Sequence, residues 1–206
     1  LATCEASRFA RELVVAEDTA LVVLDHQRSR LPDFRRVGTY VWSNTQASNR
    51  DWGWHGRDRT IAAYDAHSGK QRWTYASPVA PCSLAAHASR VVFHDGTRLV
   101  CLNRGTGERL WTESIQLESL GPGAGGTPSK ENRRGKKKGL SGPEDFSGNL
   151  HPTLVLTDEM VFCAIGETIV AKRLEDGQTL WTSEGTANYM KSSDLFVADG
   201  LVWSRD

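Results

Sequence analysis

The sequence predicts an all-β fold built from small antiparallel units that repeat along the chain. Three segments, at 61–73, 99–111 and 169–181, share one pattern that ends in tryptophan. In each of them a branched aliphatic residue lies twelve positions before the tryptophan, a small residue ten before it, and a glycine four before it. The first two tryptophans are 38 residues apart and the next two are 70 apart, which is one further period plus an insertion of 32 residues. Periods of this size are typical of stacked supersecondary units.

Each repeat also carries the signals of two turns. Gly96 and Gly166 lie fifteen residues before their tryptophans, between short runs of apolar residues. A step such as Asp95-Gly96 supplies the positive φ angles that tight hairpins need, so 90–93 and 98–102 are expected to pair as antiparallel strands. The glycine four positions before each tryptophan predicts a second turn, followed by another strand. Four short strands in about forty residues, with one fixed aromatic residue, are typical of a β-propeller blade.

The segment Ala63-x-Asp65-x-x-Ser68-Gly69-Lys70-x-x-Trp73 resembles the tryptophan-docking repeat of the pyrroloquinoline-quinone (PQQ)-like β-propeller superfamily. The pattern of that family is Ala-x-Asp-x-x-Thr-Gly-Lys-x-x-Trp. The other two copies match it more loosely, but both keep the glycine and the tryptophan. The resemblance implies that each tryptophan packs between adjacent blades. The residues to which it assigns this structural role are Trp73, Trp111, Trp181, Gly69, Gly107 and Gly177.

Two partial units are expected at the ends of the chain. Residues 21–25 match 61–65, which predicts a degenerate first blade in which Asp33 takes the place of the tryptophan. Gly200 marks a last hairpin and predicts a docking tryptophan near position 215, beyond Asp206. About four to five blades of four antiparallel strands are therefore expected. Residues 1–206 form a single domain in this interpretation, and they are part of a longer protein with a seven- or eight-bladed ring.

The insertion at 120–149 is rich in Gly, Pro and Lys, and it is expected to be a flexible loop between two blades. Its segment from Lys130 to Lys138 has six positive charges and one negative charge. Such a cluster could attract nucleic acid or another anionic surface. The preferred interpretation is a solvated loop, because no aromatic residues lie among the basic ones to stack on bases.

A second candidate surface is the aromatic stretch that contains Trp52, His55 and Arg57, which could line a recognition surface. The more conservative interpretation is packing. Trp54 lies nineteen residues before Trp73, where the other repeats have apolar strand residues, so Trp54 is expected to occupy a strand.

Composition excludes few classes of protein. The chain has 25 Lys and Arg residues and 25 Asp and Glu residues, and its apolar runs are too short for a transmembrane helix. Four cysteines show no metal-binding spacing, so small buried residues are expected rather than ligands, and their redox state is left open. These are Cys4, Cys82, Cys101 and Cys163.

Catalytic signals are weak. The six histidines show no metal-binding spacing, and the chain has no Gly-x-Ser-x-Gly motif or phosphate-binding glycine loop. The enzymes of the resembled family, the quinoprotein dehydrogenases, hold PQQ with an adjacent cysteine pair, a stacking tryptophan and a calcium site. The chain has no adjacent cysteine pair. No catalytic residue or metal ligand is therefore assigned, and no cofactor is expected.

Two functions are compatible with these features. The preferred one is a non-catalytic PQQ-like propeller that serves as a protein-binding or ligand-sensing scaffold for a protein partner. The alternative is the propeller part of an enzyme, either a quinoprotein dehydrogenase with PQQ and calcium or a propeller fused to a separate catalytic domain. The resemblance further implies an exported or periplasmic protein. Fold alone does not decide between these functions.

Overall fold

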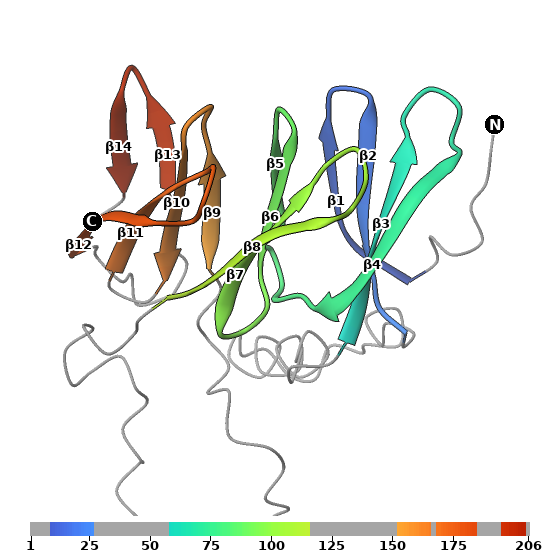
Figure 1. Ribbon diagram of the computed structural model, residues 1–206, viewed down its shortest axis with the longest axis horizontal. Coiled ribbons are helices and arrows are strands. Elements are labelled where there is room, and N and C mark those ends of the chain that lie inside the picture. The colour runs from blue at the N-terminus through green and yellow to red at the C-terminus, as the bar shows by residue number, and fades with distance from the viewer. Residues whose placement is uncertain (1–8, 27–57, 116–151, 166–167, 185–194, 205–206) are drawn as a thin grey trace, which may run out of the picture.

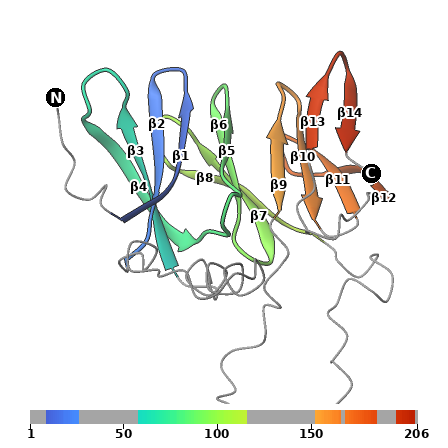
Figure 2. The same cartoon turned by 180° about the vertical axis from the view of Figure 1, so that it is seen from behind.

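The computed structural model describes residues 9–26, 58–115, 152–165, 168–184 and 195–204 of the chain (Figure 1). These residues form three four-stranded antiparallel sheets and one two-stranded sheet. Figures 1 and 2 show the sheets side by side in the order of the sequence, like successive blades. The predicted all-β propeller architecture is therefore confirmed.

The strands of each blade follow one another along the chain. The first blade contains β1 (Ala10–Ala16), β2 (Thr19–Leu24), β3 (Asp58–Asp65) and β4 (Gln71–Pro78). The second contains β5 (Ala85–His87), β6 (Arg90–His94), β7 (Arg98–Asn103) and β8 (Arg109–Ser114). The third contains β9 (Thr153–Leu156), β10 (Met160–Ile165), β11 (Thr168–Arg173) and β12 (Thr179–Glu184). The two-stranded sheet contains β13 (Leu195–Ala198) and β14 (Leu201–Ser204).

The first strand of each sheet lies next to the first strand of the following sheet. β1 contacts β5, β5 contacts β9, and β9 contacts β13. The strand β13 is therefore the inner strand of a fourth blade, of which the described residues form two strands. This arrangement corrects the interpretation of Gly200, which lies in the turn between the first and second strands of its blade. The expectation of a tryptophan near position 215 loses its basis.

The N-terminal part of the chain forms one blade where two units were expected. Strand β2 pairs with β3 in the same sheet, so residues 21–25 do not belong to a separate degenerate blade. Leu21 pairs with Ala63, just as Val92 pairs with Cys101 in the second blade. Leu21 therefore fills the strand position that was predicted for Trp54. The prediction was wrong because β2 and β3 are separated by residues 25–57, whereas the corresponding strands elsewhere are joined by a short turn.

The hydrophobic core lies between the sheets. One buried cluster combines Leu21 and Trp73 of the first blade with Val91 of the second, and another combines Val92 and Trp111 with residues of the third blade. Neighbouring residues of one strand thus face opposite junctions, because side chains alternate across a strand. This explains why the central strands have continuous apolar runs. The second and third blades, which have a neighbour on each side, contribute to a core cluster on both faces, so their stability depends on both neighbours.

No helix that could cross a membrane occurs in the part of the chain that the structure describes.

Candidate functional site

The first blade junction is closed by Trp73. Its indole Nε1 donates a hydrogen bond of 2.7 Å to the carbonyl oxygen of Arg104, which lies in the β7–β8 turn of the next blade. The ring lies against Gly107 in the same turn. Gly107 has a φ angle of 74°, in the left-handed region that favours glycine. Both the backbone conformation and the close aromatic contact therefore require glycine at this position.

The second junction repeats this arrangement. Trp111 donates from Nε1 to the carbonyl oxygen of Leu174 at 2.9 Å, and its ring lies against Gly177, which has a φ of 77°. Trp73 and Trp111 are each only 9% exposed, whereas Trp181 is 39% exposed. Gly69 also has a positive φ, of 69°. The docking role of these residues stays a prediction that substitutions can test.

Polar side chains hold the turns that contain these glycines. Asp65 Oδ1 accepts hydrogen bonds from the backbone N–H of Ser68 and of His67. The Ser68 N–H, followed by the Arg72 guanidinium, holds the pKa of Asp65 well below its usual value. Asn103 accepts from two backbone N–H groups in the second blade. Such Asx turns explain why Asp and Asn occur before the glycine.

The side chain of Arg104 fills the space between the first two blades. Its guanidinium donates to the carbonyl oxygen of Ala16 at 2.9 Å and to the carboxylate of Glu17 at 2.5 Å. Both acceptors lie at the β1–β2 turn of the first blade, and the Arg104 side chain is only 12% exposed. A charged side chain with two acceptors therefore closes this junction.

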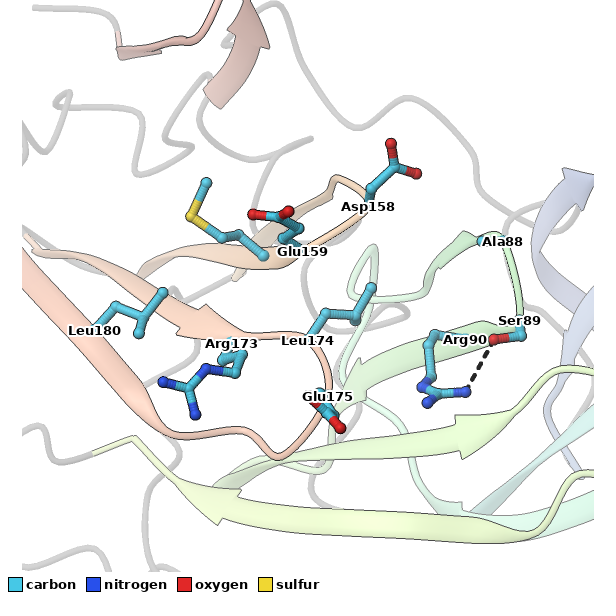
Figure 3. Close-up of a pocket in the computed structure, with 10 residues that line it drawn as sticks. Ala88, Ser89, Arg90, Asp158, Glu159, Arg173, Leu174, Glu175 and Leu180 are labelled. Atoms are coloured by element: carbon cyan, nitrogen blue, oxygen red, sulfur yellow. Dashed lines mark hydrogen bonds between the residues drawn. The ribbon is translucent and has the colours of Figure 1, made fainter.

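The second and third blades instead enclose a groove of about 470 Å³. Three turns line it, and Figure 3 shows their side chains around a common space. The β5–β6 turn contributes Ala88, Ser89 and Arg90; β9–β10 contributes Asp158, Glu159 and Met160; and β11–β12 with its flanks contributes Arg173, Leu174, Glu175 and Leu180. His87 Nε2 and Asp158 Oδ1 lie 2.7 Å apart and connect the two blades beside it.

The charges around the groove are unequal. Three carboxylates line it, from Asp158, Glu159 and Glu175. Of the two cationic side chains, Arg173 forms an ion pair with Asp176 at 2.8 Å, and Arg90 donates to the hydroxyl of Ser89. The apolar part of the lining consists of Met160, Leu174 and Leu180. The groove therefore combines an excess of negative charge with apolar surface.

The groove was not predicted, and it lies at the end of the blades opposite to the Asp95-Gly96 turn. In a meander the turns after the first and third strands lie at one end of the blade, and the turn after the second strand lies at the other. Figure 1 shows the β5–β6 and β9–β10 turns at the same edge. One sequence signal indicates the groove. The position seven residues before each tryptophan carries a different side chain in each repeat, and the three residues are Ala66, Arg104 and Leu174.

Several predicted features lie outside the described residues. They include Trp52, His55 and Arg57, the insertion at 120–149 with its basic segment, and Cys4. Among the described cysteines, Cys101 and Cys163 are buried and free, and burial raises the pKa of both thiols to about 12. Cys82 is free and exposed. No cluster of side chains that could hold a metal ion occurs among the described residues.

Two buried polar side chains support the sheets. His94 is 3% exposed at the end of β6, and its Nδ1 accepts a hydrogen bond from the Gly96 N–H at 3.0 Å. Burial lowers the pKa of His94 to about 4. Lys172 is 2% exposed in β11 and donates to Thr179 Oγ1 at 2.9 Å and to the Gly177 carbonyl at 3.3 Å. Burial also lowers the pKa of Lys172.

Comparisons with known proteins agree with the blade architecture. The chain matches a family model described as outer membrane protein assembly factor BamB at residues 7–122 and 57–203. No curated protein sequence matches the chain. Among solved structures, the computationally designed Ika8 protein is similar with 16% identity and a TM-score of 0.50, over 95% of this chain and 42% of that protein.

Two natural proteins are also similar. BamB from Moraxella catarrhalis has 17% identity and a TM-score of 0.44, over 70% of this chain and 40% of that one. A europium-containing methanol dehydrogenase has 13% identity and a TM-score of 0.42, over 85% of this chain and 26% of that one. The chain thus spans less than half the length of each of these three proteins.

Proposed function

The chain belongs to the PQQ-like repeat family described as outer membrane protein assembly factor BamB, and we propose that it acts as a non-catalytic protein-binding scaffold. The match of the family model over most of the chain carries this proposal. An assembly factor acts on other proteins, so its surface must bind them. The groove between the second and third blades supports the proposal, because turns of rigid blades commonly form binding surfaces.

The proposal includes the location and organisation of the protein. The family description implies that the protein is exported, that it acts at or near an outer membrane, and that its partner is a protein. Residues 1–206 would form one part of a propeller, with the insertion at 120–149 as a flexible loop between its second and third blades. Within the described residues, the turns between strands offer the surfaces available to a partner.

The alternative is the propeller part of a quinoprotein dehydrogenase. It is favoured by the similarity to a family whose repeat is named for PQQ, and one structurally similar protein is a methanol dehydrogenase. No group of side chains that could hold a metal ion occurs among the described residues, and the sequence has no adjacent cysteine pair. The family model described as an assembly factor is the observation that favours the scaffold over the dehydrogenase.

Two measurements test the proposal. Calorimetric titration of the full-length parent protein with PQQ and Ca²⁺ should give no binding heat. Tight one-to-one binding of PQQ would instead favour the dehydrogenase.

The second measurement is photo-crosslinking in the source organism, with a photoreactive residue placed at several turns of the propeller in turn. A scaffold should give an adduct with a defined exported protein, and the adduct should depend on the position of the crosslinker. Crosslinking that is absent from every turn would contradict the scaffold function.

A further inference from the structure

We infer that the groove between the second and third blades binds a segment of a partner protein that carries a basic side chain next to an apolar one. This inference rests on the proposed scaffold function and adds to it a site and the chemistry of the partner. The main argument comes from the first junction of the same chain, which shows what fills the corresponding space.

Arg104 and Leu174 are equivalent residues. Each lies seven positions before the next tryptophan in the chain. The N–H of Arg104 donates to the Ser89 carbonyl at 2.9 Å, and the N–H of Leu174 donates to the Glu159 carbonyl at 2.8 Å. Each also accepts an indole N–H from the preceding blade on its own carbonyl oxygen. The backbone at the two junctions is therefore the same, and only the side chains differ.

The difference in side chains leaves space at the second junction. Arg104 crosses from its blade to Glu17 and to the backbone of the β1–β2 turn. Leu174 is shorter and apolar, and it packs into the core below the groove, with 4% of its surface exposed. In the β5–β6 turn, Ala88 lies at the position that Glu17 has in the β1–β2 turn. The φ angles of Ala88 and Glu17 are 45° and 50°, respectively. The groove thus occupies the position that a cationic side chain fills at the first junction.

The charges of the groove favour a cationic occupant. Glu159 and Glu175 line it in addition to Asp158, which also contacts His87. Two arginines also line the groove, so three carboxylates face two cations, and one of these, Arg173, is already paired with Asp176. The other, Arg90, donates to the Ser89 hydroxyl. An incoming guanidinium or ammonium group would lie in a field of net negative charge. Because the interaction is partly exposed, it should weaken at high salt.

The apolar lining explains why the occupant should carry an apolar residue as well. Leu180 is 43% exposed, and it lines the groove together with Met160. An exposed leucine at a groove gains free energy when a partner covers it. A segment with alternating Arg and Leu residues would place both chemistries in contact with the groove.

The test uses three fluorescein-labelled peptides and the 206-residue chain. The first peptide is acetyl-Gly-Leu-Arg-Leu-Arg-Gly-amide, the second has Glu in place of Arg, and the third has Ser in place of Leu. Fluorescence anisotropy measures their affinities, and NMR amide shifts locate the bound peptide. We expect the first peptide to bind at least about tenfold more tightly than either of the others. Its largest shifts should come from Ser89 and Glu175.

Matched variants separate binding at the groove from binding elsewhere. Leu180→Ser should weaken binding of the first peptide about fivefold. Leu110→Ser is the control, because Leu110 also precedes a docking tryptophan and is 40% exposed, but it does not line the groove. Glu175→Gln should weaken binding, whereas Glu108→Gln in the corresponding turn of the second blade should not. Leu174→Arg should fill the groove from within and abolish binding.

Thermal unfolding of every variant shows whether it is folded, and the Glu175→Gln result stands if Leu174→Arg fails to fold. The inference is overturned if the Glu peptide binds as tightly as the Arg peptide, or if Leu110→Ser weakens binding as much as Leu180→Ser. It is also overturned if position-dependent crosslinks form only at other turns, an outcome that leaves the scaffold function intact. PQQ binding would contradict the scaffold function itself.

Discussion

Gly107 lies so close to Trp73 that a Cβ atom added to it would come within 2.6 Å of the indole Cδ2. We therefore expect Gly107→Ala to destabilise the protein by about 3 kcal/mol, from the strain of its positive φ together with the steric clash. Gly200→Ala is the matched control. Gly200 has the same φ of 74°, but nothing lies within 4 Å of an added Cβ atom, so the cost should be about 1 kcal/mol. Chemical denaturation measures both values, and equal losses would show that the contact with Trp73 contributes nothing.

Truncation of a docking tryptophan should lower the free energy of unfolding most where the ring is buried. Trp111→Ala removes a buried ring and its hydrogen bond to the Leu174 carbonyl, so we expect a loss of about 3–5 kcal/mol. In the 206-residue chain, Trp181→Ala should cost much less, because Trp181 is 39% exposed there. Urea unfolding measured for both variants checks this order. The reverse order would contradict the assignment of Trp111 to the junction core.

Acid should destabilise the protein through His94. In the unfolded chain its imidazole binds a proton below pH 6.5, whereas in the folded protein it does so only below about pH 4. Between these values the unfolded state binds more protons, so stability falls as pH decreases, by about 3 kcal/mol in total. His94→Asn keeps an acceptor for the Gly96 N–H and removes the titration. The pH dependence of unfolding between pH 7 and 4 should therefore be smaller in this variant, and an unchanged dependence would assign it to other groups.

Lys172 should give a pH dependence of the same sign as His94, but in the alkaline range. Its folded-state pKa is lowered by burial, so in the alkaline range below pH 10.5 the unfolded chain binds more protons and wild-type stability rises with pH. Lys172→Met removes the buried charge and should be neutral or stabilising by about 1 kcal/mol at pH 7. This difference should shrink as the pH approaches 10. Strong destabilisation at pH 7 would show that the hydrogen bonds to Thr179 and Gly177 outweigh the desolvation of the ammonium group.

The sequence predicts the blades well wherever short-range chemistry determines them. The turns at Gly107 and Gly177 were predictable, because a positive φ and a following tryptophan leave a local signature. The register of the first blade was not, because β2 and β3 are distant in sequence and Leu21 carries no signal that distinguishes it from Trp54. Gly200 was assigned to the wrong hairpin because an Asp-Gly step fits more than one turn of a blade.

The groove could not be predicted in the same way. It depends on turns of two different blades, and their juxtaposition is set by the packing between sheets. The aligned repeats show that Leu174 stands where the second repeat has Arg104. The consequence of this difference depends on which residues the Arg104 guanidinium contacts. Only the contact with Ala16 and Glu17 shows that this position reaches the neighbouring blade.

The separation between backbone and side chain at these turns has an evolutionary consequence. Arg104 and Leu174 use their main-chain carbonyl groups to hold adjacent blades together, and that contribution is independent of the side chain. Mutation there can change what a junction accepts without loss of the ring architecture. A repeated fold of this kind can therefore acquire new binding specificities one junction at a time, while selection for folding acts on the glycines and tryptophans.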